Sequence, residues 1–179
     1  MTLPRRQNQI DVASAIATYL RRSDGDWQSE RRYYTLPEGT TQEIISFITV
    51  RFLEPGSEEL IRLAGLHGLA DEMALDCGSH VTWESTDRIS GRKQSKGSTL
   101  FGVSGSTLYR DRGFATPKPI TAAYHMPDPN TLCLRTEYNG SVFEEEIKQI
   151  GDKYRTRQTI ISRAGEQVMI GQYLEKRIS

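Results

Sequence analysis

Ten short stretches rich in β-forming residues, each bounded by turn residues, dominate the sequence. They lie at 27–36, 42–54, 80–88, 98–103, 106–115, 119–126, 130–139, 142–150, 153–162 and 167–177. The separators include Pro127-Asp128-Pro129, Asn139-Gly140 and Gly151-Asp152, and short strands joined by tight turns are typical of an antiparallel meander. About ten such strands can close into a barrel around a cavity. The sequence therefore predicts an all-β chain.

Two segments depart from this pattern and predict helices. Asp11 can cap a helix that runs to about residue 22, and its apolar residues lie on one side only: Ala13, Ile16, Ala17 and Leu20. We expect this helix to lie against the outside or the mouth of the barrel, preceded by a loose arm over 1–9. A second, short helix is predicted to start at 55–60, where acidic residues occupy the first turn. Residues 70–78 receive no assignment.

Charge and length exclude several classes of protein as the default. With 23 basic and 23 acidic residues among 179, the chain lacks the basic excess of nucleic-acid and membrane-surface proteins. It has no apolar run of membrane-spanning length, and 1–9 lack the apolar core of a secretory signal. Cys77 and Cys133 lie far apart without a CxxC spacing, which favours a reducing compartment. We expect one domain over 1–179, with neither nucleic-acid nor membrane partners.

One hairpin near the end of the chain concentrates charged residues. Its first strand carries Glu144-Glu145-Glu146, and its second carries Arg155, Arg157 and Thr159, which share a face because alternate residues of a strand do so. If this face points into a barrel, the arginines need anionic partners, since unpaired buried charge is costly. Carboxylates of the protein and of a ligand can supply them together. The alternative is an outward face with cross-strand ion pairs, the commoner place for charged residues.

The register of this hairpin decides which acid faces the arginines. A two-residue turn at Gly151-Asp152 sets Glu146 opposite Arg157, whereas a three-residue turn over 150–152 sets Glu145 there. Because a slip of one residue exchanges the two faces of a strand, both registers remain open at this point.

No motif of a common metal or catalytic site is present. His67, His80 and His125 have no HxxxH or HxH spacing, so we expect no metal site. Ser104 lies in a run that resembles GxSxG, but it lacks the following helix that a nucleophile elbow needs. Both cysteines are expected to be small buried residues.

Other arginines lie in the first predicted strand and in a middle strand. Arg31 shares a strand face with Trp27, Ser29 and Tyr33. Arg110 and Arg112 share a face in a middle strand, and we expect both to be solvated. The basic turn at 92–96 is expected to be a solvated loop, with docking of a partner as the alternative.

Several short motifs in a fixed order resemble a known family. They are Trp27-Gln28-Ser29-Glu30-Arg31 after a short helix, Val81-Thr82-Trp83, Arg112-Gly113-Phe114-Ala115 followed by 119–124, Thr136-Glu137-Tyr138, Glu144-Glu145 and Arg155-Thr156-Arg157. Their joint order and spacing, over about residues 10–175, resemble the S/U-type (CpcS/CpeS/CpcU) phycobiliprotein chromophore lyases of cyanobacteria and some plastids.

The resemblance implies a lipocalin-like, fatty-acid-binding-protein-like barrel of ten strands with an N-terminal helix. It implies an open-chain bilin such as phycocyanobilin as a substrate, with no tightly bound cofactor. Members of the family attach the bilin by a thioether to a cysteine of an apo-phycobiliprotein subunit (phycocyanin, allophycocyanin or phycoerythrin), in the cyanobacterial cytoplasm or the plastid stroma. A homodimer, or a heterodimer with a related lyase, is a further expectation.

The same resemblance implies roles for individual residues. Glu145, ten positions before Arg155, matches the functional acid, which favours the three-residue turn. The implied catalytic residues are Glu145, Arg155 and Arg157, and the implied bilin-binding residues are Arg31, Trp83, Tyr124 and Thr159. Trp83 and Tyr124 are expected to stack on the tetrapyrrole, with core packing as the alternative.

The chain departs from the family pattern at Glu30, Tyr34 and Lys148, where the family has glutamine, histidine and tryptophan; these positions bear on the choice of chromophore. Two rival functions use the same basic cavity. One is a non-enzymatic carrier of bilin, heme or fatty acid, and the other is a helper subunit that is active only beside a related lyase.

Overall fold

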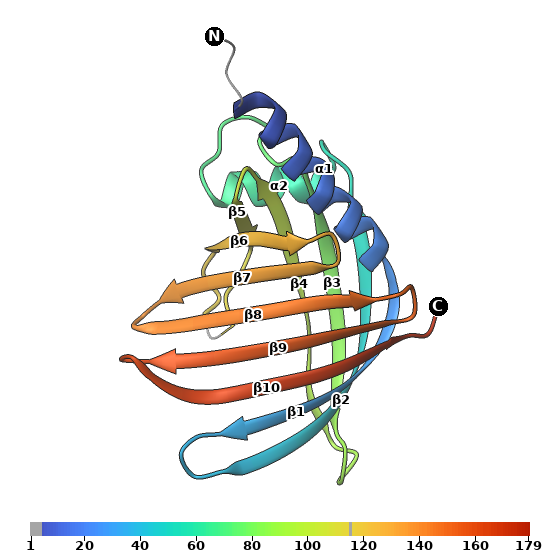
Figure 1. The fold of residues 1–179 in the computed structure, drawn as a ribbon, viewed down its shortest axis with the longest axis vertical. Helices are drawn as coiled ribbons and strands as arrows, with labels where there is room; N and C mark the ends of the chain where they lie inside the picture. Colours follow the sequence, from blue (N-terminus) through green and yellow to red (C-terminus); the bar gives the residue numbers. More distant parts are fainter. Residues whose placement is uncertain (1–4, 115) are drawn as a thin grey trace.

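The computed structural model describes residues 5–114 and 116–179, with side chains from Ala13 onward. Within this part of the chain, ten antiparallel strands form a closed barrel in which each strand pairs with its neighbours in sequence and β10 closes on β1 (Figure 1). The elements are α1 (Arg5–Ser23), β1 (Gly25–Thr35), β2 (Thr40–Leu53), α2 (Glu58–Leu66), β3 (Cys77–Asp87), β4 (Lys93–Ser104), β5 (Thr107–Arg110), β6 (Ile120–Asp128), β7 (Thr131–Tyr138), β8 (Ser141–Ile150), β9 (Tyr154–Arg163) and β10 (Glu166–Arg177). The predicted all-β barrel with an N-terminal helix is confirmed.

Three boundaries differ from the prediction by more than three residues. Helix α1 begins at Arg5, so a loose arm over 1–9 is wrong for 5–9, and 1–4 lie outside the described residues; no glycine or proline interrupts 5–10. Strand β4 begins at Lys93, because 93–98 pair with β3 across a bulge, so most of the predicted loop at 92–96 is an exposed strand. Strand β5 ends at Arg110, since the Asp111 carboxylate accepts hydrogen bonds from Thr99 and Leu100 of β4 and ends the pairing.

The turn between β7 and β8 is the one that its sequence predicts. Asn139 and Gly140 have φ values of 52° and 74°, and Tyr138 pairs directly with Ser141. Positive φ at both central residues is the geometry of a type I′ hairpin turn, which asparagine and glycine tolerate best. This turn fixes the register of β7 against β8, and so determines which side chains of β8 face the interior.

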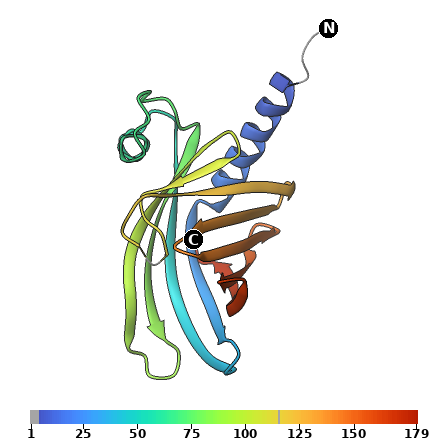
Figure 2. The same ribbon diagram turned by 90° about the vertical axis from the view of Figure 1, so that its left-hand side faces the viewer.

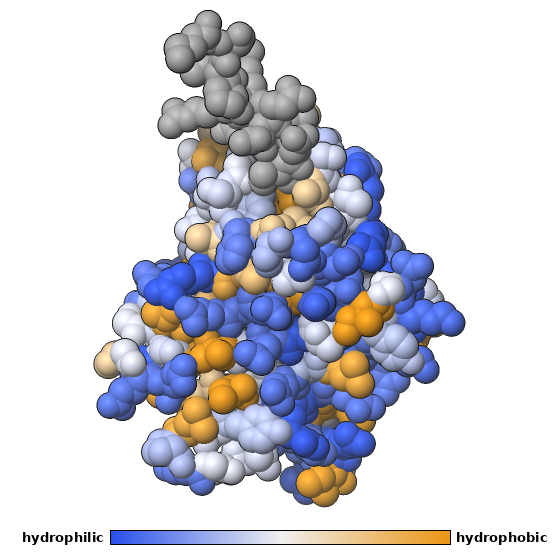
Figure 3. All heavy atoms as spheres, viewed as in Figure 1, coloured by the Kyte–Doolittle hydropathy of each residue, from blue (hydrophilic) through white to orange (hydrophobic). Residues whose placement is uncertain are grey.

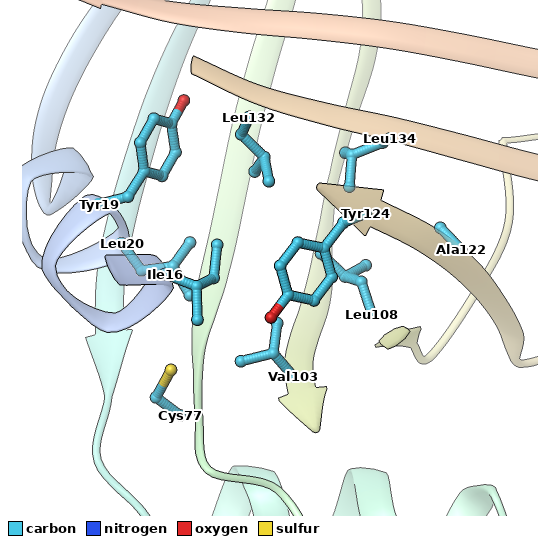
Figure 4. Packing of buried hydrophobic residues seen from close by; sticks show 10 residues of the cluster. All are labelled: Ile16, Tyr19, Leu20, Cys77, Val103, Leu108, Ala122, Tyr124, Leu132 and Leu134. Carbon is cyan, nitrogen blue, oxygen red and sulfur yellow. The ribbon is translucent and has the colours of Figure 1, made fainter. Parts of the chain in front are cut away.

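Helix α1 closes one end of the barrel. Ile16, Tyr19 and Leu20 point from the helix toward barrel-wall residues that include Leu132 and Leu134, and all five are buried (Figure 4). Figure 2 shows that the N-terminal part of α1 projects beyond the barrel. The apolar stripe of the helix therefore packs at the mouth of the barrel, one of the two positions expected from the sequence.

Helix α2 packs on the outside of β3 and β4. Leu60 and Leu63 of α2 are buried together with Leu75 and Leu100. Gly102 permits this contact, because a Cβ atom there would lie 2.7 Å from the Leu75 side chain. Elsewhere the exterior differs: over the strands that face the viewer in Figure 3, hydrophilic side chains predominate and hydrophobic ones form separate patches. Of the helices described, none has the length and apolar character needed to cross a membrane.

The C-terminal end of α1 is tied to the barrel by polar side chains. Gln149 on β8 donates to the Tyr19 carbonyl at 3.1 Å and to the Ser23 hydroxyl at 2.9 Å. The Arg177 guanidinium donates to the carbonyls of Arg22 and Asp24. The last carbonyls of a helix have no backbone partner within it, so Arg177 satisfies that of Arg22. The Tyr19 carbonyl also accepts from the Ser23 hydroxyl at 3.1 Å, and together these bonds fix α1 over the barrel end.

We expect Gln149→Ala to lower the free energy of unfolding by about 1–3 kcal/mol, because it removes two buried hydrogen bonds, one to the Tyr19 carbonyl and one to the Ser23 hydroxyl. Urea denaturation followed by tryptophan fluorescence measures the change. Gln158→Ala, at an exposed position on β9, is the control and should change the free energy of unfolding by less than about 0.5 kcal/mol. Equal stability of Gln149→Ala and the parent would contradict the anchoring role of this side chain.

Candidate functional site

The barrel encloses a cavity of about 260 Å³ with two chemically different parts. One part is apolar and includes Leu108, Leu132 and Leu134. The other carries positive charge, because five arginines line it: Arg31, Arg110, Arg112, Arg155 and Arg157. A ligand that fills the cavity must therefore combine an apolar body with negative charge.

The hairpin of β8 and β9 has neither of the two registers considered from the sequence. Its turn has three residues, Gly151 to Lys153, so Ile147 pairs with Arg157 and Glu145 pairs with Thr159. Both earlier predictions of the residue directly opposite Arg157 were therefore wrong. Glu145 still shares the inner face with Arg157 as its diagonal neighbour, a separation that long side chains can span.

Two ion pairs lie on this inner face, each with a buried carboxylate. Arg157 donates through Nε to Glu145 at 3.1 Å, and its terminal nitrogen bonds the same carboxylate oxygen. Arg155 donates through Nε to Glu175 of β10 at 2.7 Å, and the Glu175 side chain has no exposed surface. The face of Arg155, Arg157 and Thr159 thus points inward, so the outward alternative is wrong and protein carboxylates supply part of the required negative charge.

The arginine charges control the ionisation of Glu175. Burial by itself raises the pKa of this carboxyl, but Arg155, then Arg157 and Arg31, and a hydrogen bond from Ser29 act in the opposite direction, and the net pKa is lowered. For Arg157, burial opposes the charged form, whereas the charge of Glu145 raises the guanidinium pKa above its ordinary range. Glu175 and Arg157 therefore both stay charged inside the barrel.

Aromatic rings support the arginines. The guanidinium carbons of Arg155 and Arg177 lie 4.6 Å and 4.3 Å from the centre of the Trp27 ring, and the Trp27 indole donates to the Ser23 carbonyl at 2.9 Å. Tyr173 lies 5.2 Å from Arg31 and 5.6 Å from Arg157, measured from guanidinium carbon to ring centre. Such contacts stabilise cations that are partly removed from water.

Of the two aromatic rings expected to stack on the tetrapyrrole, Trp83 lines the cavity and Tyr124 does not. Trp83 lines the cavity, covers Gly97 so closely that a Cβ there would lie 2.8 Å from the ring, and lies 5.7 Å from the Arg112 guanidinium. Tyr124 does not line the cavity: it is buried in the core, and its hydroxyl donates to the Gly105 carbonyl at 2.6 Å. Its placement matches the core-packing alternative.

The remaining sequence-predicted residues divide in the same way. Arg31, Arg155 and Arg157 line the cavity, whereas Glu145 and Thr159 are buried on the inner wall behind it. Among the described residues, no group of three or more His, Cys, Asp or Glu side chains is arranged to hold a metal ion.

Comparison with known proteins places this barrel in a family. The family model described as "CpeS-like protein" matches residues 15–178. The chain belongs to the CpeS-like family. One relative, 66% identical over 92% of both chains, is "Putative phycocyanobilin lyase CpcS 2" of Nostoc sp. (strain PCC 7120). Another, 49% identical over 92% of this chain and 82% of its own, is "Putative chromophore lyase CpcV" of Picosynechococcus sp..

A solved structure shares the fold of this CpeS-like chain. The S-type phycobiliprotein lyase CPES from Guillardia theta superimposes with a TM-score of 0.76, covers 92% of this chain and 93% of its own, and is 20% identical. The likeness extends over most of the chain and supports the architecture described above.

Sequence reasoning missed several residues of the CpeS-like cavity. Arg110 was expected to be solvated, but it is only 8% exposed and lines the cavity, so that expectation was wrong; Arg112 is exposed at the cavity. Glu175 was not considered. It lies two residues after Tyr173, so the two side chains share a strand face, and an acid on a face with an aromatic residue was a signal in the sequence. The side of the sheet that Arg110 faces follows from the short β5 and its pairing with β4, which the sequence did not define.

The three departures from the family pattern lie outside this cavity. Glu30 and Lys148 are exposed on the outer face, and Tyr34 is half-buried on the same side of β1 as Glu30. None of the three lines the cavity. They therefore do not select a chromophore by direct contact with it there.

We expect the stabilising effect of Glu175 to depend on pH. Its pKa in the folded protein is below the ordinary value of 4.5, so the unfolded chain takes up its proton first as the pH falls, and stability decreases with falling pH. The advantage of the parent over Glu175→Gln is therefore fully present above about pH 4.5 and shrinks below it. Urea titrations at several pH values measure it, with Glu144→Gln, at an exposed position, as control. A pH-independent difference for Glu175→Gln would contradict this account.

Proposed function

We propose that the chain is a phycobilin lyase. It binds an open-chain tetrapyrrole such as phycocyanobilin in the barrel and directs formation of a thioether to a cysteine of an apo-phycobiliprotein subunit. The names of its relatives, which include a phycocyanobilin lyase and a chromophore lyase, support this assignment. A cytoplasmic or stromal location is part of the same proposal and agrees with the two free cysteines.

The charge balance of the cavity is the observation that carries the proposal. Five arginines line the cavity, and two carboxylates, Glu145 and Glu175, pair with two of them. The surplus positive charge, next to an apolar wall, matches an apolar ligand with more than one carboxylate. A bilin carries two propionates on a conjugated apolar skeleton, and a guanidinium can bind a carboxylate through two parallel hydrogen bonds.

Glu145 gives the cavity a second function in this proposal. The pyrrole N–H groups of a bilin need an acceptor, and we assign this role to Glu145, which is hydrogen-bonded to the cavity-lining Arg157. A carboxylate in that place favours the protonated chromophore. Protonation withdraws electron density from the conjugated system and makes the ethylidene carbon more electrophilic.

The acceptor subunit supplies the nucleophile, so the lyase needs none of its own. The sulfur adds to the ethylidene carbon, and the thiol proton ends on the ring carbon that carries this group; the addition therefore has no leaving group and needs no oxidant. The role of the barrel is to orient the bilin and to shield it from addition at other positions. Trp83, at the cavity wall, is placed to pack against the tetrapyrrole.

A transfer experiment tests the proposal. The protein is mixed with phycocyanobilin, desalted, and its visible spectrum is recorded with and without the apo-phycocyanin β subunit. We expect a red-shifted band that moves to the subunit and survives acid denaturation there, because only a covalent adduct persists in acid. A protein that binds no colour would refute the proposal.

Two other outcomes identify the rival functions. Colour that stays with the protein in the presence of every apo-subunit tried points to a carrier. Colour that is transferred only when a second lyase is added points to one subunit of a heteromeric enzyme, and one relative, 28% identical, is named "Phycocyanobilin lyase subunit CpcS".

Arg157 is expected to anchor the ligand. Because a hydrogen bond to a charged group contributes about 1.5–3 kcal/mol, Arg157→Ala should weaken binding of phycocyanobilin by about tenfold or more. Fluorescence quenching of the tryptophans measures the dissociation constant. Since this variant leaves Glu145 buried without its partner, the double variant Arg157→Gln with Glu145→Gln is measured beside it, and Arg135→Ala, an exposed position on β7, is the control. Unchanged affinity in both Arg157 variants would exclude an anchoring role.

A further inference from the structure

Arg110 differs from the other arginines of the cavity because it is buried and yet has no carboxylate partner among the described residues. It is the last residue of β5, is 8% exposed and lines the cavity. Arg155 and Arg157 are also withdrawn from water, but each has an acid within hydrogen-bonding distance. Among the described residues, no carboxylate lies within 4.0 Å of the Arg110 guanidinium, and its buried Nε atom has no hydrogen-bond partner.

Such an arrangement is costly for the protein alone. A buried guanidinium without an anion loses its hydration and gains no ion pair. Burial lowers the pKa of Arg110, and the charge of Arg157 acts in the same direction, whereas Glu145 raises it from beyond ion-pair distance. A leucine or methionine in its place would avoid this cost, so packing alone gives no reason for a charged group here.

Two aromatic rings position the guanidinium. Its central carbon lies 4.9 Å from the centre of the Phe101 ring and 4.5 Å from that of Phe114. Phe114 in turn stacks on Phe143, with ring centres 4.9 Å apart. Rings offset part of the cost of the cation but leave the buried Nε–H without an acceptor. They also limit access of water, and a carboxylate that reaches the group therefore binds in an environment of low dielectric constant.

We propose that Arg110, bracketed by Phe101 and Phe114, is an anchoring site for one carboxylate of the ligand. The assignment rests on the proposed function and adds a specific contact to it. Arg110 takes a propionate of the bilin through its guanidinium, with the unpartnered Nε as one of the donors. Arg31 and Arg112 also lack an acidic partner among the described residues, but Arg112 is exposed and Arg31 half-buried, so each loses less hydration and gains less from the same contact.

The test compares two ligands that differ only in the carboxylates. Dissociation constants are measured for phycocyanobilin and for its dimethyl ester, in which both propionates are blocked, on the parent and on Arg110→Met. The parent should bind the acid at least tenfold more tightly than the ester. Arg110→Met should lose most of this preference through weaker binding of the acid, while its affinity for the ester stays within about threefold of the parent.

Two further variants complete the design. Arg110→Lys keeps the charge without the planar fork and should retain part of the preference. Arg51→Gln, at an exposed position on β2, should leave both affinities unchanged. In addition, Arg110→Met should be at least as stable as the parent in urea without ligand, because it removes an unpaired buried charge; this readout does not require bilin and also verifies folding.

The outcomes separate this assignment from the proposed function. If Arg110→Met weakens acid and ester equally, or lowers stability without altering the acid-to-ester ratio, Arg110 is a packing residue and the assignment is wrong. If the parent itself binds neither ligand, the proposed function fails and the assignment fails with it. A parent that binds both ligands equally excludes a carboxylate anchor while leaving bilin binding intact.

Discussion

The ion pairs of Arg155 with Glu175 and of Arg157 with Glu145 are the interactions on which the rest of the interior depends. They join β8, β9 and β10 from the inside, where each partner has lost most of its hydration. Removing one partner of such a pair destabilises the fold far more than replacing both partners by apolar residues, because it leaves a buried charge unpaired. Trp27 extends the arrangement by packing against Arg155 and Arg177, and Arg177 also holds the end of α1. Closure of the barrel and the charge of its cavity are therefore one structural feature.

The charge inside the barrel also shows where stability has been exchanged for binding. An apolar interior of similar volume would be as stable or more so, since burying ion pairs seldom stabilises a fold by itself. The guanidinium groups of Arg155 and Arg157 are held in place by carboxylates of the protein, whereas that of Arg110 has no carboxylate partner among the described residues. The first kind makes the site rigid before binding, and the second leaves interaction energy to be gained when a ligand carboxylate arrives.

Local signals in the sequence predicted most of the architecture. The errors arose where the structure depends on contacts between residues far apart in the sequence. Asn139-Gly140 determines its turn through its own φ preferences, so the neighbouring strands were predicted correctly. Gly151 is compatible with turns of two or three residues, and the choice between them depends on how the side chains of β8 and β9 pack, so both registers considered were wrong. Glu175 lies opposite Arg155 only because a bulge between Gln167 and Met169 shifts the pairing of β10. Arg110 was misjudged because burial of a charged residue depends on the rings that surround it in space.

The positions at which this chain departs from the family pattern now have a physical interpretation. Glu30, Tyr34 and Lys148 lie on the outer side of the barrel, so a change there cannot alter contacts inside the cavity directly. The cavity, in contrast, keeps the arginines and Trp83 that the resemblance implied. Side chains that line the cavity and side chains that face the outside therefore lie on opposite faces of the same strands, since successive side chains alternate between them. A substitution on the outer face therefore leaves the charged lining of the cavity in place.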